Sequence, residues 1–115
     1  MTLTQISLLA FLGVASGGLL LVSLIALRRR IPAFLSAGHG LGGLAALALL
    51  FAAALQGEAQ TPALTWWALG VLLSAFTGGM LLFRVIFRHR ATLPLAALHG
   101  SLAALGIYLL YRAAV

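Results

Sequence analysis

The chain of 115 residues contains no cysteine, and its only acidic residue is Glu58. Without cysteine it forms no disulfide and offers no thiolate to zinc or to an iron–sulfur cluster. Its apolar stretches also lack acids and lysines, so general acid–base chemistry there would depend on histidine alone. These absences argue against a hydrolytic or group-transfer site, and they leave open whether the chain is an enzyme.

Charge of either sign is scarce, while apolar residues dominate. Hydrophobic residues make up 63% of the chain and charged residues 7%, and the mean hydropathy is +1.18. Such a chain cannot cover a surface with polar groups and belongs to the membrane class. Six of the seven arginines fall in two short clusters beside apolar stretches, so the net charge of +6 indicates topology and not nucleic-acid binding.

Four apolar stretches are long enough to cross a hydrocarbon core of about 30 Å, which takes ~20 helical residues. They span residues 6–27, 32–55, 64–87 and 94–111. We therefore expect an all-α membrane protein, with residues 1–115 forming a single transmembrane domain of four helices.

The connections between these stretches differ in charge. Loops 28–31 and 88–93 are basic, whereas the only charged residue of the middle loop is Glu58. The positive-inside rule places the two basic loops in the cytoplasm and both termini outside, an N-out/C-out topology. We expect an integral protein of the bacterial inner membrane. Aromatic residues typical of a membrane interface mark the outer side, namely Trp66, Trp67, Tyr108 and Tyr111.

The sequence also repeats itself. Residues 16–21 resemble residues 77–82, which begin 61 positions later, and His39-Gly40 recurs as His99-Gly100 after 60 positions. This pattern predicts a four-helix bundle of two tandem helical hairpins in parallel orientation.

Histidines and double glycines of the two repeats share one depth. His39 lies nine residues after Arg30, and His99 lies nine after Arg90; Gly18 lies ten residues before Arg28. The second repeat matches this spacing with Gly78. At a rise of 1.5 Å per residue, these positions all lie about 14 Å from the arginines. One layer of the bundle should therefore hold both histidines and both double glycines.

Two opposed imidazoles are the natural axial ligands of a six-coordinate haem. In a bundle wound in sequence order, the second and fourth helices are diagonal, so His39 and His99 would point at the central axis from opposite sides. The porphyrin would spread towards the first and third helices, where glycine lets the backbone approach a flat ligand closely. The glycines at these positions are Gly17, Gly18, Gly78 and Gly79.

This pattern resembles the four-helix core of membrane b-type cytochromes. In that family the second and fourth helices supply histidine ligands and the first and third carry glycines that make room for haem. The resemblance implies His39 and His99 as metal ligands, with the four glycines as clearance positions. Cytochrome b of the quinol-oxidising complexes has two histidines on each ligand helix and two haems. This chain has one on each, so the resemblance implies one haem b.

Simpler interpretations exist for each part of the pattern. Glycines commonly mediate close helix packing, and the Gly13/Gly17 and Gly38/Gly42 pairs fit the small-xxx-small pattern. Each histidine could instead bond to a carbonyl or a hydroxyl of a neighbouring helix, with duplication copying a structural residue. The candidate hydroxyls belong to Ser36, Ser74 and Ser101. An antenna-type role, with histidine binding a chlorophyll magnesium, also stays open.

Six of the seven arginines divide into two groups, and the seventh, Arg112, is an exception to the charge bias because it lies on the expected outer side near the C-terminus. Those of the basic loops are expected to anchor the topology and meet anionic head groups of membrane lipids. Arg84 lies one turn inside the third helix, where it would either extend to the interface or bind a haem propionate. His89, in the second basic loop, is expected to be solvated.

The sequence therefore predicts a membrane electron-transfer protein or subunit that binds one bis-histidine haem. With almost no mass outside the membrane, it would meet quinone or a partner subunit of a larger redox complex within the bilayer. The alternative is a cofactor-free accessory subunit of a respiratory or photosynthetic assembly, whose glycines dock partner helices or lipid.

Overall fold

The computed structural model describes residues 1–86 and 92–115. This part of the chain is helical and contains no strand. Its four helices are α1 (Leu3–Ala26), α2 (Ala33–Gln56), α3 (Pro62–Met80) and α4 (Leu93–Ala114), and a short π-helix, η1 (Leu81–Ile86), continues α3. Each of the four spans, with α3 and η1 taken together, is long and apolar enough to cross a membrane. The prediction of an all-helical chain with four such spans is confirmed.

Local signals explain the helix ends that differ from the expected ones. A capping box between Thr2 and Gln5 starts α1 at Leu3, three residues before the expected start. Pro62 occupies the first turn of α3, where its missing N–H costs no hydrogen bond. Gly57 ends α2 in the left-handed conformation with φ of 68°. The expected end of the third helix at Phe87, and the basic cluster Arg88, His89 and Arg90, lie outside the described residues.

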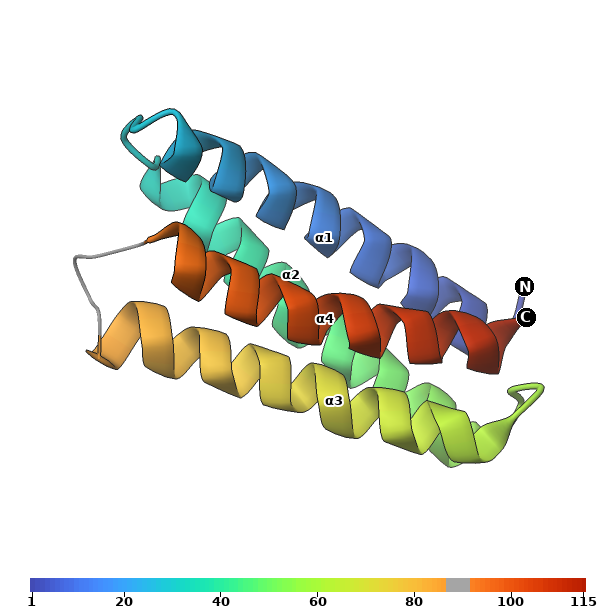
Figure 1. The fold of residues 1–115 in the computed structure, drawn as a ribbon. Helices are drawn as coiled ribbons and strands as arrows, with labels where there is room; N and C mark the ends of the chain where they lie inside the picture. The colour runs from blue at the N-terminus through green and yellow to red at the C-terminus, as the bar shows by residue number, and fades with distance from the viewer. Residues whose placement is uncertain (87–91) are drawn as a thin grey trace.

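The four helices form an elongated bundle with principal extents of 42 × 22 × 18 Å. Helix α1 packs beside α2 and α4, and α3 packs beside the same two helices. Helices α2 and α4 therefore lie on one diagonal of the bundle and α1 and α3 on the other. Both chain termini lie at one end, here called the terminal end; residues 28–30 lie at the opposite end, here called the arginine end (Figure 1).

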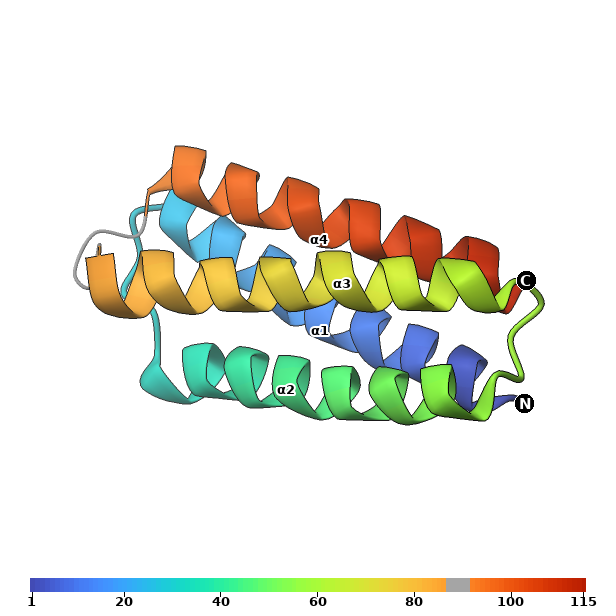
Figure 2. The same ribbon diagram turned by 90° about the horizontal axis from the view of Figure 1, so that it is seen from below.

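Packing differs sharply between the two ends. The hydrophobic core lies towards the terminal end and contains Phe11, Leu47, Leu50, Leu72 and Leu110. Between the histidines and the arginine end, Ala96 is the only buried residue in the described part of the chain. The views agree with this, because the helices converge towards the termini and spread towards the other end (Figures 1 and 2).

The core follows the sequence repeat. Most buried residues of α1 and α2 have a buried counterpart in α3 and α4, 60 or 61 positions later. The pairs are Thr4/Thr65, Ser7/Ala68, Phe11/Leu72, Ala46/Gly106, Leu50/Leu110, Ala53/Ala113 and Ala54/Ala114. The two halves of the chain thus contribute equivalent faces to one interior.

Candidate functional site

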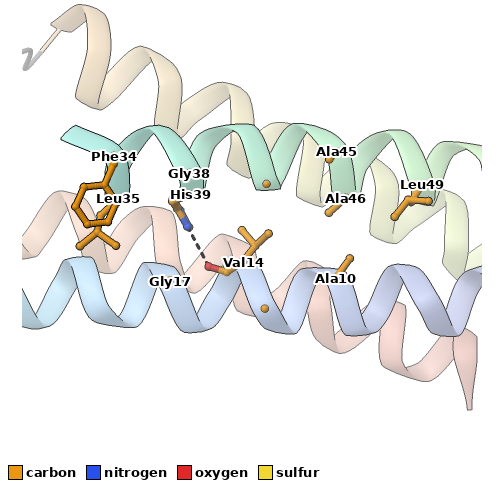
Figure 3. Close-up of a pocket in the computed structure, with 12 residues that line it drawn as sticks. Ala10, Val14, Gly17, Phe34, Leu35, Gly38, His39, Ala45, Ala46 and Leu49 are labelled. Carbon is orange, nitrogen blue, oxygen red and sulfur yellow. Dashed lines mark hydrogen bonds between the residues drawn. The ribbon is translucent and has the colours of Figure 1, made fainter. Parts of the chain in front are cut away.

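The ring of His39, a residue of α2, is held by a hydrogen bond to the neighbouring helix α1. Its Nδ1 lies 3.0 Å from the carbonyl oxygen of Val14, and Figure 3 shows the ring reaching from α2 to that carbonyl. Gly18 is one helical turn beyond Val14. A Cβ atom on Gly18 would lie 3.0 Å from Cε1 of His39, so glycine leaves the Val14 carbonyl open to the imidazole.

His99 repeats this arrangement on α3. Its Nδ1 lies 3.0 Å from the carbonyl oxygen of Ala75, again four residues before a glycine. A Cβ atom on Gly79 would lie 2.7 Å from Cε1 and 2.8 Å from Nδ1 of His99. The second glycine of each pair therefore has a local role that sequence reasoning missed: it opens the carbonyl four residues earlier to the histidine.

The structure brings the two histidines together across the diagonal of the bundle. Their ring centroids are 6.2 Å apart, and the ring planes meet at 82°. Two imidazoles that bind one metal ion from opposite sides, at about 2.0–2.1 Å per bond, have centroids roughly 6 Å apart. The separation is compatible with a shared axial pair, and it is also that of an ordinary edge-to-face contact between two rings.

The hydrogen bonds also define which ring nitrogen is available. A carbonyl oxygen only accepts, so each Nδ1 carries the proton and donates it to Val14 or Ala75. In a neutral ring of this tautomer Nε2 holds the lone pair, and within residues 1–86 and 92–115 no hydrogen-bond partner reaches it. Metal-bound histidines usually donate the other ring N–H in this way, which sets the tautomer and the ring orientation.

The four glycines are not equivalent. Gly18 and Gly79 lie against the imidazoles, and a Cβ on Gly17 would lie 3.8 Å from Nδ1 of His39. A Cβ on Gly78 would meet nothing within 4 Å. Gly18 and Gly79 thus make room for the histidine rings. Of the four glycines expected to leave space for a flat ligand, only Gly78 has no neighbouring atom within 4 Å of its Cβ position.

Neither histidine bonds to a serine among the described residues. Ser36 donates to the Ala33 carbonyl, and Ser74 donates to the Gly70 carbonyl, each within its own helix. The simpler interpretation, a bond from histidine to a neighbouring carbonyl, describes the Nδ1 atoms correctly. It gives no role to the two Nε2 atoms.

The π-helix η1 makes the surroundings of the two histidines unequal. It places the ring of Phe83 5.9 Å from that of His99, at 87°, while the equivalent position in α1 holds Val22. Short π segments inside helices are often found at functional sites. Nothing in the sequence predicted this segment. Arg84, on the same turn, is exposed.

His39 also lines an open groove of about 570 Å³ between α1 and α2. Small residues form much of its wall, including Gly13 and Gly42. Gly17 and Gly38 also line it (Figure 3). A Cβ on Gly13 or Gly38 would meet nothing within 4 Å. These two glycines are therefore not needed for packing inside the chain.

In the described part of the chain, no three His, Cys, Asp or Glu side chains gather to hold a metal ion. A haem needs only two protein ligands, because the porphyrin supplies the other four. Comparison with models of known families, with curated proteins and with solved structures finds no match for this chain.

Proposed function

We propose that this chain is a membrane electron-transfer protein, or a subunit of one, that binds a single haem b between His39 and His99. The observation that carries the proposal is the pair of imidazoles with centroids 6.2 Å apart, each anchored through Nδ1. Duplication of a structural histidine would also give a counterpart on the diagonal helix, but it would not require the two rings to lie at a separation that suits one shared ion.

The arrangement of the chain suits a large flat ligand on the arginine side of the histidines. Few described residues are buried there, so a ligand on this side would cover side chains that the chain alone leaves partly exposed. Near the depth of the histidines, the backbone of Gly78 has free space where a side chain would lie, so a flat ligand could approach it. Exposed Arg84 lies nearer the arginine end and would pair with a propionate through charge-assisted bonds.

The haem, when bound, would supply a one-electron couple. The role of the protein is to hold both imidazoles in place. The Val14 and Ala75 carbonyls orient each ring and hold the proton of the neutral imidazole on Nδ1, so that Nε2 would be the ligand nitrogen, and they increase its basicity. The apolar surroundings favour the less charged form of the site and exclude water.

The proposal includes a membrane orientation. The arginine end faces the cytoplasm and the terminal end faces outwards, so the two halves of the chain are parallel hairpins with both termini outside. In the bacterial inner membrane the chain would exchange electrons with quinone or with a partner subunit of a larger redox complex. Lipid head groups would meet the arginines.

A second candidate function rests on the groove between α1 and α2. Gly13 and Gly38 lie open there, and small residues let a helix of another protein approach closely. In this alternative the chain is an accessory subunit without a cofactor, and the histidines only join neighbouring helices. Such a chain would purify in fixed stoichiometry with a larger respiratory or photosynthetic complex.

An absorption spectrum of the purified protein, before and after reduction with dithionite, tests the proposal. We expect a Soret band and a reduced α-band of the b type. His39→Gln and His99→Gln should each remove these bands, because the carboxamide can still donate to the carbonyl but is a poor iron ligand. His89→Gln, in the basic loop, is the matched control and should keep them. A folded, colourless wild-type protein after expression with ample haem would overturn the proposal.

A further inference from the structure

The rings of His39 and His99 have matching hydrogen bonds but different neighbours. Nδ1 of each lies 3.0 Å from its carbonyl acceptor, Val14 or Ala75. His99 has a further contact, because the ring of Phe83 meets it edge to face at 5.9 Å and 87°. Among residues 1–86 and 92–115, the only aromatic partner of His39 is His99 itself. Since edge-to-face pairs are favourable, His99 is held more firmly than His39.

The backbone of the neighbouring helix also approaches the two rings unequally. A Cβ atom on Gly79 of α3 would lie 2.7 Å from Cε1 of His99, whereas one on Gly18 of α1 would lie 3.0 Å from Cε1 of His39. In closely packed surroundings a ring can move only if its neighbours move too. The ring of His99 is therefore the more confined of the two.

Space adjoins the ring of His39. This residue lines the groove of about 570 Å³ between α1 and α2, and its ring lies between these two helices (Figure 3). Gly13 of α1 and Gly38 of α2 line the same groove. A Cβ atom on either glycine would meet nothing within 4 Å. The groove thus offers room into which the imidazole of His39 can turn.

The internal repeat shows that this room belongs to the first half of the chain. Several glycines that line the groove are replaced by larger residues at the equivalent positions of the second half, 60 or 61 residues later. The pairs are Gly13/Ser74, Gly38/Leu98 and Gly42/Leu102. The residue that contacts His99, Phe83, likewise has the smaller Val22 as its counterpart. The two halves therefore surround equivalent histidines with side chains of different size.

Resting on the proposed function, we infer that His39 is the exchangeable ligand of the pair and His99 the fixed one. A small neutral molecule of the class of carbon monoxide then takes the place of His39 on ferrous iron. The bond from Nε2 of His39 to the iron breaks, and a bond from the carbon of carbon monoxide forms. No proton or electron is transferred, because the imidazole leaves as the neutral ring and turns into the groove.

Titration of the reduced, haem-containing protein with carbon monoxide tests the inference, with the shift of the Soret band as the readout. We expect the wild type to bind carbon monoxide. Gly38→Leu introduces into the groove the side chain that the second half has at this position. It should lower the affinity about tenfold, because the ring of His39 then turns into occupied space. Gly13→Leu, on the opposite wall, should act in the same direction.

Gly40→Leu is the matched control for the groove variants. Gly40 is also adjacent to His39 on α2, and its Cβ atom would likewise meet nothing within 4 Å. It is not among the residues that line the groove. This variant should therefore leave the affinity for carbon monoxide unchanged.

Phe83→Val identifies the histidine that leaves, because it gives the second half the residue of the first. At saturating carbon monoxide, the rate of binding equals the rate at which a histidine leaves the iron. Of the two histidines, Phe83 contacts only His99, so this rate should not change. If His99 were the ligand that leaves, loss of the contact would raise the rate about two- to tenfold.

The outcomes separate the inference from the proposed function. A haem spectrum that carbon monoxide leaves unaltered would overturn the inference alone. Wild-type affinity in both Gly38→Leu and Gly13→Leu, or a faster rate in Phe83→Val, would overturn it as well. A colourless protein would instead contradict the proposed function, and the inference with it.

Discussion

The two ends of the bundle are built from the same four helices but differ in how many residues they bury. Towards the terminal end, equivalent residues of the two halves interlock, and Leu50 and Leu110 are fully buried. Towards the arginine end the same four helices bury almost nothing among the described residues. The histidines lie at the boundary. Stability therefore comes mainly from the terminal half.

The largest effect should follow from truncating a side chain of the terminal half. Leu50→Ala removes a fully buried side chain and should lower the free energy of unfolding by about 2 kcal/mol. This is the low end for such cavities, because lipid and not water surrounds the unfolded helices. Thermal unfolding in detergent measures it.

Leu41→Ala is the control for that experiment, since Leu41 is on the same helix and is 67% exposed. It should change stability little. Equal losses for the two variants would contradict the idea that the terminal half holds the bundle together.

Gly106→Ala should be the next most damaging change. Its Cβ would lie 2.5 Å from Cγ and 3.3 Å from the backbone nitrogen of Leu72, a buried core residue. Overpacking of this kind typically costs about 1–3 kcal/mol. Gly100→Ala, on the same helix, meets nothing within 4 Å and should leave the denaturation midpoint unchanged. A stable Gly106→Ala protein would show that α3 and α4 can move apart at this level.

Gly79→Ala tests the layer of the two histidines, which lies between the two ends. The new Cβ would displace the ring of His99 and weaken its bond to the Ala75 carbonyl, at a cost of about 1 kcal/mol. We expect a small loss of stability but a large loss of haem, read as the ratio of Soret to protein absorbance. Gly18→Ala should do the same more mildly, because its closest contact is 3.0 Å.

Gly78→Ala is the informative control here. Nothing surrounds its Cβ, so stability should not change. If haem binding falls without a change in stability, the ligand itself occupies the space beside Gly78. If haem binding is unaffected, the porphyrin edge lies elsewhere.

Arg84→Gln should have the smallest effect, since Arg84 is exposed and lies in the sparsely packed half. Stability should be unchanged. Removal of a positive charge near haem should lower the midpoint potential by roughly 30–60 mV, where 60 mV in a one-electron couple corresponds to about 1.4 kcal/mol. Redox titration measures this shift, and an unaltered potential would place the propionates away from Arg84.

Sequence reasoning was most successful where spacing determines depth. The positions of His39 and His99 relative to the arginines predicted their shared layer, and helix length predicted the four spans. The capping box at Thr2 and the Thr4/Thr65 pair were readable from the sequence but were not recognised. The bonds to Val14 and Ala75 depend on which way each imidazole turns, and the π-helix that contains Phe83 depends on contacts between helices. Neither leaves a periodic signal in a single sequence.

The hydrogen bonds of the histidines have a consequence for the architecture as a whole. His39 is anchored by α1 and His99 by α3, so each half of the chain carries its own imidazole, carbonyl and glycine as a finished unit. The peptide that joins the halves, residues 57–61, makes two local backbone hydrogen bonds, Gly57 to Ala53 and Leu64 to Thr61, and one to a distant helix, from Gln60 to the carbonyl of Ala113. In these terms the molecule resembles a dimer of two similar hairpins that a short peptide joins, and each hairpin brings its own histidine to the shared layer.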